Sequence, residues 1–362
     1  MQVKVQPIQE EAVCASSVQL QGSNNVLHSA GAGTRRPRLR FPSGCGNRKE
    51  LQEQHKAAWE NCDSYRWVKF LLCSDDVRLV FDRFPPAGSN TGIGKTTAIE
   101  LAKRGARVIL ACRSKQRGEA ALQDVKRESG SNQVVFMQLD LASLKSVRSF
   151  AENFLKTEPR LDILVNNAGL FNFGRTEDGF GMTFGVNHLG HFLLTNLLLD
   201  RLKECGPSRV VNVSSGAHNW GRVDFDCLNT HKTLRTGTSF VDGQRVYADS
   251  KLCNVLFTYE LAKRLKGTKV TCYSLHPGVV RTDIIRNASP TFQLVALNGL
   301  RFFMKTPLQG SQTTLHCALH EGIEHLSGRH FSNCTARDVL AKAKDPVTAK
   351  KLWEISERFC DL

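Results

Sequence analysis

Residues 88–113 read GSNTGIGKTTAIELAKRGARVILACR: a glycine-rich turn, an amphipathic helix and an apolar strand. The same alternation continues along the chain. Strands are predicted at Arg107–Ala111, Val134–Gln138, Leu161–Val165, Arg209–Val213 and Lys269–Leu275, and helices at Gly94–Arg104, Lys115–Glu128, Leu144–Lys156, Phe180–Lys203 and Tyr247–Lys266. Apolar strands that alternate with helices are typical of a parallel sheet buried on both faces. The sequence therefore predicts an α/β domain with a doubly wound, Rossmann-type parallel sheet.

The glycine-rich turn suits a phosphate-binding loop. Its glycines let the backbone approach a pyrophosphate, whose charge meets the N-terminus of the following helix. An alternative is a nucleoside triphosphate loop, because Ser89–Thr96 reads S-x4-G-K-T, with serine in place of the first glycine. No magnesium site follows, so we favour a dinucleotide. Its expected contacts are Gly88, Ser89, Asn90, Gly92, Ile93 and Gly94.

The end of the second strand indicates which dinucleotide binds. An NAD site usually has Asp or Glu about 20 residues after the loop, where it binds the ribose 2′-hydroxyl. This chain has Ala111-Cys112-Arg113 there, with Lys95 as a second cation in the neighbourhood. A guanidinium pairs with a 2′-phosphate in a two-pronged geometry. We therefore predict NADP(H) as the cofactor; the alternative is that Arg113 is an ordinary surface residue.

Tyr247 and Lys251 are the candidate proton-transfer pair. Their i,i+4 spacing places both on one helix face, about one turn apart. An ammonium at Lys251 favours the phenolate, so we expect the Tyr247 pKa to fall below its usual value near 10. Such a group donates and accepts protons nearer neutral pH.

Further polar residues follow the strands of the predicted sheet, where ligands gather in open α/β folds. Ser214 and Ser215 end one strand, Asn167 ends another, Asp140 follows the third, and Asn187 lies in an otherwise apolar helix. Each also has a structural interpretation. The serines are candidate helix caps, Asn167 a turn residue, Asp140 an N-cap, and Asn187 a helix-to-helix hydrogen bond.

Five motifs occur together in residues 88–283: the glycine loop, NNAG, NVSS, YxxxK and HPG. In this combination the chain resembles the short-chain dehydrogenase/reductase family, and LDILVNNAG, NHLGHFLLT and HPGVVRT resemble its retinol-dehydrogenase branch. The resemblance implies that Tyr247 exchanges the proton, Lys251 holds the nicotinamide ribose, Ser215 orients the substrate carbonyl and Asn187 completes a proton relay. It also implies cofactor contacts at Asp140 and Leu141 (adenine), Asn167, Ala168 and Gly169 (adenosine ribose), and Val280 and Thr282 (nicotinamide side).

The function that this resemblance implies is the interconversion of a hydrophobic alcohol and its aldehyde or ketone, with a retinoid or lipid aldehyde leading. Apolar residues after Pro277, including Phe292, Leu294 and Phe303, are expected to cover a greasy substrate or to touch a membrane peripherally; ordinary helix packing explains them equally well. One alternative is a catalytically weak scaffold on the same fold. Another is a nucleic-acid binder that uses the RRPRLR run near the N-terminus.

The net charge and the cysteine pattern bear on which of these functions the protein has. The net charge is +15, of which residues 1–86 contribute +3. Most of the positive charge therefore belongs to the dehydrogenase-like part, and no nucleic-acid partner is predicted.

The twelve cysteines are scattered without metal-ligand spacing, so we expect reduced thiols and no metal. His188 and His191, three residues apart, could pair on a metal, but with no third ligand we expect them to pack or to line the substrate site. Without a signal peptide or spanning segment the chain is predicted to be cytoplasmic, although anchored relatives point to the endoplasmic reticulum membrane.

The segment before the glycine loop departs from the family pattern. Pro85 and Pro86 stand where an apolar first strand is expected, and proline is excluded from central strands. Val77–Phe81 is the predicted substitute strand. We therefore expect an atypical, loosely structured tail over residues 1–75 and a dehydrogenase domain over 76–362, with a substrate-covering segment from about 284.

Overall fold

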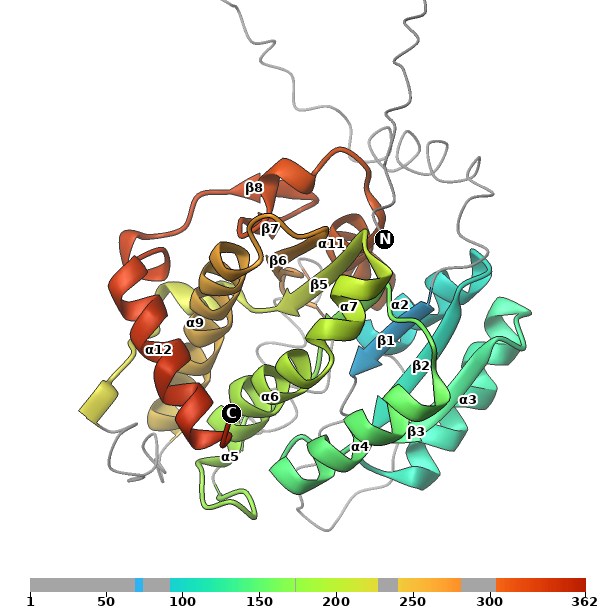
Figure 1. Cartoon of the computed structure of the whole chain (residues 1–362), viewed down its shortest axis with the longest axis horizontal. Coiled ribbons are helices and arrows are strands. Elements are labelled where there is room, and N and C mark those ends of the chain that lie inside the picture. The colour runs from blue at the N-terminus through green and yellow to red at the C-terminus, as the bar shows by residue number, and fades with distance from the viewer. Residues whose placement is uncertain (1–68, 74–91, 173, 227–239, 281–303) are drawn as a thin grey trace, which may run out of the picture. The chain divides into compact units, whose positions relative to one another are not determined.

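The computed structural model of the chain describes residues 69–73, 92–172, 174–226, 240–280 and 304–362 (Figure 1). The chain divides into two compact units, Met1–Glu60 and Asn61–Leu362, and all the described residues belong to the second unit. Of the expected tail over residues 1–75, only residues 69–73 are described. The RRPRLR run, the proline pair and residues 281–303, which include the apolar residues after Pro277, lie outside the described residues.

Within the described residues, eight strands form one sheet in the order β3-β2-β1-β4-β5-β6-β7-β8. Neighbouring strands pair in parallel except for β7 and β8, which are antiparallel. The strand order reverses between β1 and β4, and in open α/β sheets ligands bind at the carboxyl ends of the strands beside such a point. The strands are β1 Lys69–Cys73, β2 Arg107–Cys112, β3 Val134–Gln138, β4 Ile163–Asn166, β5 Ser208–Val213, β6 Val270–His276, β7 His330–Ser332 and β8 Thr335–Arg337.

Helices cover both faces of this sheet. Figure 1 is viewed from the face of α4 (Leu144–Thr157), α6 (Gly190–Leu197), α7 (Leu199–Cys205), α9 (Phe240–Arg264) and α12 (Pro346–Phe359). Side chains of α4, α6, α9 and α12 join one buried apolar cluster with the facing strand residues. On the other face α11 (Pro307–Leu319) packs on α2 (Ile93–Lys103), which packs on α3 (Lys115–Ser129). The predicted doubly wound α/β fold is confirmed.

The first strand lies elsewhere than the sequence predicted. Lys69–Cys73 fills the central position, paired with β2 on one side and β4 on the other. Val77–Phe81, the predicted substitute, lies outside the described residues, and the prediction that it forms this strand is wrong. The sheet therefore begins upstream of residue 76. KFLLC is an apolar run without proline, which suits a strand buried on both faces.

Two helices also differ from their predicted bounds. The predicted single helix over 180–203 is divided into α5 (Met182–Phe184), a π-helical turn η2 (Gly185–Leu189), α6 and α7. Such π turns are frequent at functional sites, and this one contains Asn187. The helix of Tyr247 and Lys251, α9, begins at Phe240, seven residues earlier than predicted.

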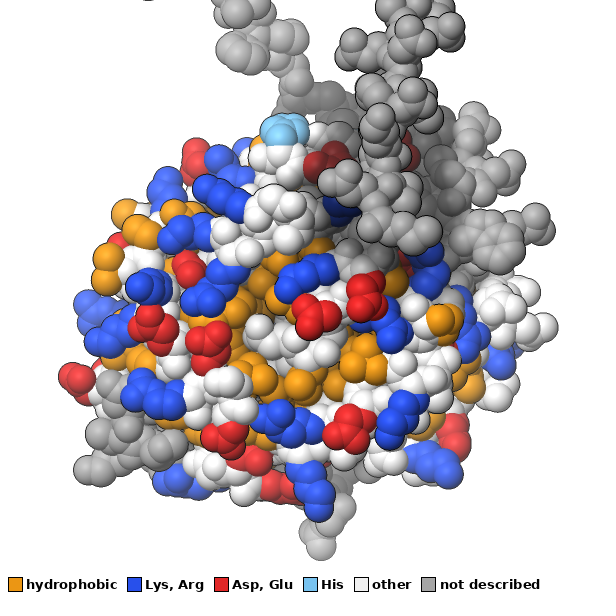
Figure 2. Space-filling view, in the orientation of Figure 1, with side chains coloured by type: hydrophobic (Ala, Val, Ile, Leu, Met, Phe, Trp, Pro, Cys, Tyr) orange, Lys and Arg blue, Asp and Glu red, His pale blue; other side chains and the backbone are white. Residues whose placement is uncertain are grey.

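The distribution of charged side chains on the surface bears on how the net positive charge of the chain is interpreted. Figure 2 shows Lys and Arg side chains interspersed with Asp and Glu over the face of α4, α6, α9 and α12. Many are paired locally, for example Lys203 with Asp200 and Arg329 with Asp338. Such mixing is unlike the single-sign surface that binds phosphate backbones. Among the described helices, none is long and apolar enough to cross a membrane.

Candidate active site

Residues from four parts of the fold meet beside the carboxyl ends of β4 and β5. Gly169 follows β4, Asn187 comes from η2, and Lys251 comes from α9. A Cβ added at Gly169 would lie 2.9 Å from Lys251 Nζ and 3.8 Å from Asn187 Oδ1. Gly169 therefore allows the lysine to pass close to the backbone. Ser215 follows β5 and hydrogen-bonds Tyr247, one turn before Lys251 on α9.

Lys251 is the most deeply buried charged group of this cluster. Its side chain is 2% exposed, and its ammonium donates to the Val213 carbonyl over 3.1 Å. Among the described residues no carboxylate forms an ion pair with it. Burial therefore disfavours the charged form and lowers the Lys251 pKa to about 8.

The pKa of Tyr247 is shifted in the direction opposite to the prediction. Burial raises the Tyr247 pKa above its ordinary value, while the hydrogen bond with Ser215 acts in the opposite direction. Lys251 Nζ lies 5.6 Å from the centroid of the Tyr247 ring, and its ammonium is directed to a backbone carbonyl. The prediction that Lys251 gives Tyr247 a lowered pKa is thus wrong for the protein alone. Desolvation exceeds the attraction of a single cation at that distance.

The two serines after β5 have different surroundings. Ser214 is buried, and its hydroxyl donates to the Lys251 carbonyl over 2.7 Å, so it fixes α9 against the sheet. Ser215 is partly exposed; its hydroxyl accepts from the Ala217 amide and caps the short turn η3 (Gly216–Asn219). Ser215 therefore acts as a cap and also contacts Tyr247.

Asn187 uses its side chain to hold the neighbouring backbone. Its Oδ1 accepts from the Leu170 amide over 2.8 Å, and its Nδ2 donates to the Leu170 carbonyl and to Ser250 Oγ. The helix-to-helix hydrogen bond expected as the structural interpretation is present, through Ser250. His191 Nδ1 lies 3.2 Å from the Asn187 backbone oxygen. Ser250 was missed at sequence level, although its place next to Lys251 was a usable signal.

The N-terminus of α2 is the predicted phosphate-binding end of the candidate site. Gly92 precedes this helix, Ile93 and Gly94 begin it, and its first turn contains no acidic residue. Such an end attracts anions. Gly88, Ser89, Asn90 and Thr282 lie outside the described residues.

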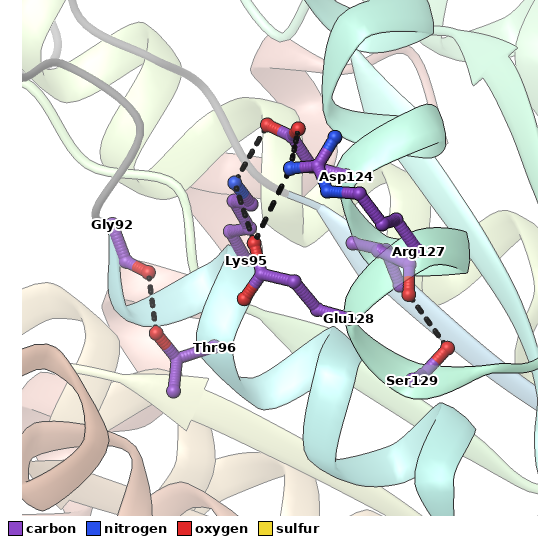
Figure 3. Close-up of polar contacts among 8 residues, drawn as sticks. Gly92, Lys95, Thr96, Asp124, Arg127, Glu128 and Ser129 are labelled. Atoms are coloured by element: carbon purple, nitrogen blue, oxygen red, sulfur yellow. Dashed lines mark hydrogen bonds and ion pairs between the residues drawn. The ribbon is translucent and has the colours of Figure 1, made fainter.

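Lys95 points away from this helix end. Figure 3 shows it directed at α3, where its ammonium lies 2.7 Å from Asp124 and 3.4 Å from Glu128. Arg127 contacts the same Asp124 carboxylate, and both cations lower its pKa. Lys95 thus ties α2 to α3 and is paired with carboxylates. Its expected role as a second cation for a 2′-phosphate loses support.

The remaining predicted cofactor residues line the ends of β2, β3 and β4. Arg113 follows β2 and is partly exposed; among the described residues no carboxylate pairs with its guanidinium. Asp140 accepts from the Ala142 amide over 2.9 Å, and its interpretation as an N-cap is wrong, because Ser143 caps α4. Leu141 is buried, and its carbonyl would be 2.6 Å from a Cβ at Gly190. Ala168 is buried, and the Asn167 amide donates to the Val165 carbonyl.

Val280 follows the carboxyl end of β6 and forms a parallel bridge with Lys305. Its side chain would contact a Cβ at Gly310 of α11, as would Ile93 of α2. Within the described residues, no group of three or more His, Cys, Asp and Glu is arranged to hold a metal ion.

Comparisons with known proteins agree with this geometry. The family model described as short chain dehydrogenase matches residues 87–227. Dehydrogenase/reductase SDR family member 13 of Bos taurus is 53% identical over 276 residues, which cover 76% of this chain and 72% of the relative. The chain belongs to the short-chain dehydrogenase/reductase family.

Other relatives lie in the retinol-dehydrogenase group of this family. Retinol dehydrogenase 11 of Homo sapiens is 49% identical over 293 residues, covering 80% of this chain and 88% of the relative. A solved structure of an uncharacterized protein from Mycobacterium paratuberculosis aligns with a TM-score of 0.58 and 32% identity, covering 82% of this chain and 93% of that one. The chain is therefore an oxidoreductase by family, in a family that uses nicotinamide cofactors.

A second solved structure shares the fold at lower identity. It is a short-chain dehydrogenase from Shigella flexneri complexed with NADP, with a TM-score of 0.55 and 22% identity, covering 74% of this chain and 97% of that one. In this chain Ser215 and the α9 residues Tyr247 and Lys251 lie beside the carboxyl end of β5, next to the switch point of the sheet.

Proposed function

We propose that this protein is an NADP(H)-dependent oxidoreductase that interconverts a hydrophobic alcohol and its aldehyde or ketone. A retinoid or a lipid aldehyde is the leading substrate class. The observation that carries the proposal is the grouping of Tyr247, Ser215 and Lys251 beside the switch point of the sheet, with Gly169 keeping the lysine close to the backbone. In that arrangement the Ser215 hydroxyl would orient a substrate carbonyl, and the Tyr247 hydroxyl would exchange a proton with the substrate oxygen.

The protein's part in the reaction is positioning and proton transfer. When bound, the cofactor would supply or accept the hydride at the substrate carbon. Ser215 would donate a hydrogen bond to the substrate oxygen. In reduction Tyr247 would give its proton to that oxygen and be reprotonated from solvent; in oxidation it would take the proton from the alcohol. The Lys251 ammonium, charged at neutral pH, would favour the tyrosinate that remains.

The residues present fit a nicotinamide dinucleotide. The α2 N-terminus, with no acidic residue in its first turn, would meet the diphosphate, and Gly169 leaves the backbone open beside Lys251. The end of β2 supports NADP(H) over NAD(H), because Arg113 stands where an NAD site has a carboxylate. Because Lys95 is paired with Asp124, we assign the contact with the 2′-phosphate to Arg113.

A hydrophobic substrate is supported by the relatives and by the sequence. Retinol dehydrogenases 11 and 12 of Homo sapiens are 49% and 48% identical to this chain over most of its length. The weak scaffold alternative rested on the disrupted first strand and is not favoured, because Lys69–Cys73 pairs with both neighbouring strands.

The test is a reduction assay with purified protein, NADPH, all-trans-retinal and a panel of aliphatic aldehydes, with Tyr247→Phe as the control. Wild-type turnover is expected with NADPH, and the variant should lose about 10²–10⁴-fold in kcat while still binding NADPH. NADPH binding without turnover of any carbonyl compound would support the scaffold alternative and refute the enzyme.

A further inference from the structure

Three histidines surround the turn that carries Ser215, and the mechanism above uses none of them. His218 lies in η3, directly after that serine; His276 ends β6; and His330 lies in β7. The rings of His218 and His330 are in contact, with their centroids 4.7 Å apart and their planes inclined at 53°, and both side chains are buried. His330 Nδ1 hydrogen-bonds Ser274 Oγ over 3.0 Å, which fixes the His330 ring to β6.

His276 joins two turns that lie on different loops. Its Nδ1 accepts a hydrogen bond from the Gly278 amide over 3.2 Å. On its other side, a Cβ added at Gly216 would lie 3.3 Å from Nε2 and 3.4 Å from Cε1. Gly216 follows Ser215 directly, so one imidazole packs against the serine turn while it closes the Pro277–Gly278 turn. The backbone of that turn is unusual, because Gly278 has φ +97°.

The hydrogen bonds define the protonation of two rings. The Ser215 carbonyl only accepts, so His218 Nδ1, 2.6 Å away, carries a proton. The Gly278 amide only donates, so His276 Nδ1 is bare and the proton of the neutral ring lies on Nε2. Burial lowers the pKa of His276 to about 4, so the ring is neutral at physiological pH.

The Gly278 bond resembles an Asx turn, in which a side-chain acceptor binds the amide two residues later. An Asn side chain makes the same bond, because its Oδ1 stands about as far from the backbone as a histidine Nδ1. A Gln side chain extends toward the position of Nε2 instead. These two substitutions therefore separate the Gly278 hydrogen bond from mere filling of space.

We infer that His276 is a positioning residue that couples the Ser215 turn to the Pro277–Gly278 turn, so that the substrate-orienting hydroxyl and the cofactor-side backbone are held in one arrangement. This inference rests on the proposed function. His276 acts through Ser215 and Gly278 and touches neither substrate nor cofactor in this role.

The test compares His276→Asn, His276→Gln and His276→Leu, with His325→Leu as a control at an exposed histidine. Two readouts are used: kcat and KM with NADPH, and hydrogen–deuterium exchange of residues 214–220 and 276–280. The Leu and Gln variants should lose about tenfold in kcat and exchange faster in both segments, in line with one lost hydrogen bond. The Asn variant should stay within about threefold of wild type, and the control should be unchanged.

Equal behaviour of the Asn and Gln variants, an unchanged Leu variant, or faster exchange in only one of the two segments would overturn the inference. If wild-type protein turns over no substrate, the proposed function fails. The exchange data then still decide whether His276 couples the two turns.

Discussion

Replacing Lys251 with methionine is expected to abolish turnover and, at the same time, to stabilise the fold. The Lys251 ammonium is buried without a carboxylate partner among the described residues, and burial lowers its pKa to about 8. A charge in this position raises the free energy of the folded state. Methionine has a similar length, carries no charge and adapts to irregular surroundings.

The size of the effect follows from the pKa. The difference between 10.5 in the unfolded chain and about 8 in the folded protein corresponds to about 3 kcal/mol at pH 7, at about 1.4 kcal/mol per unit. The Val213 carbonyl keeps a second donor, Asn254 Nδ2 at 3.3 Å, so the substitution does not leave it unpaired. After about 1 kcal/mol for the lost hydrogen bond, the expected gain is about 2 kcal/mol, or about 4–8 °C in Tm.

The assay is urea unfolding of wild type and Lys251→Met at pH 7 and pH 9.5, with the exposed Lys266→Met as the matched control. Because the folded-state pKa of Lys251 lies below its unfolded-state value, the destabilisation by the charge is complete below about pH 8 and disappears toward pH 10.5. The advantage of the methionine variant should therefore shrink at pH 9.5. A variant less stable than wild type at pH 7, or a difference that does not change with pH, would refute the reasoning.

Three further predictions follow from the same geometry. Gly169→Ala places a Cβ 2.9 Å from Lys251 Nζ, so kcat with NADPH should fall at least about tenfold while Gly174→Ala, in open space, leaves it unchanged; equal rates would contradict this. Arg113→Asp should lower the ratio of kcat/KM for NADPH to that for NADH about 100-fold, and an unchanged ratio would remove Arg113 from the cofactor site. Burial lowers the pKa of His188 to about 3 and that of His191 to about 4. Below about pH 6.5 both residues are therefore protonated in the unfolded chain but still neutral in the folded protein. The free energy of unfolding should thus fall by up to about 1.4 kcal/mol per pH unit for each between pH 6.5 and 4, and urea midpoints that do not change from pH 7 to 5 would be inconsistent with it.

The sequence predicted the sheet because its strands are locally encoded. Val and Ile runs such as Arg107–Cys112 form strands buried on both faces, and helices between them bring the strands into parallel order. The first strand was mislocated, because KFLLC ends at Cys73 and α2 begins only at Ile93. Connections in α/β units usually have two to six residues, so a strand that far upstream carries no local signal.

The candidate site was predicted in its residue types and less well in its electrostatics. The Tyr247–Lys251 spacing on one helix is readable from the chain. The direction of the Tyr247 pKa shift is not, because desolvation depends on everything packed around the ring. The pairing of Lys95 with Asp124 joins residues of two different helices and has no pattern in the sequence. The π-helical turn at Asn187 was likewise hidden within a uniform apolar helix pattern.

Transfer of label from the cofactor to the product tests the proposed chemistry most directly. Wild-type protein and Tyr247→Phe would each be incubated with all-trans-retinal and NADPH that carries deuterium at both C4 positions of the nicotinamide, and the alcohol product analysed by mass spectrometry. The expected result is retinol with one deuterium at the former carbonyl carbon from wild type, and no product from the variant on the same timescale. Retinol without deuterium, or equal yields from the two proteins, would contradict hydride transfer supported by Tyr247.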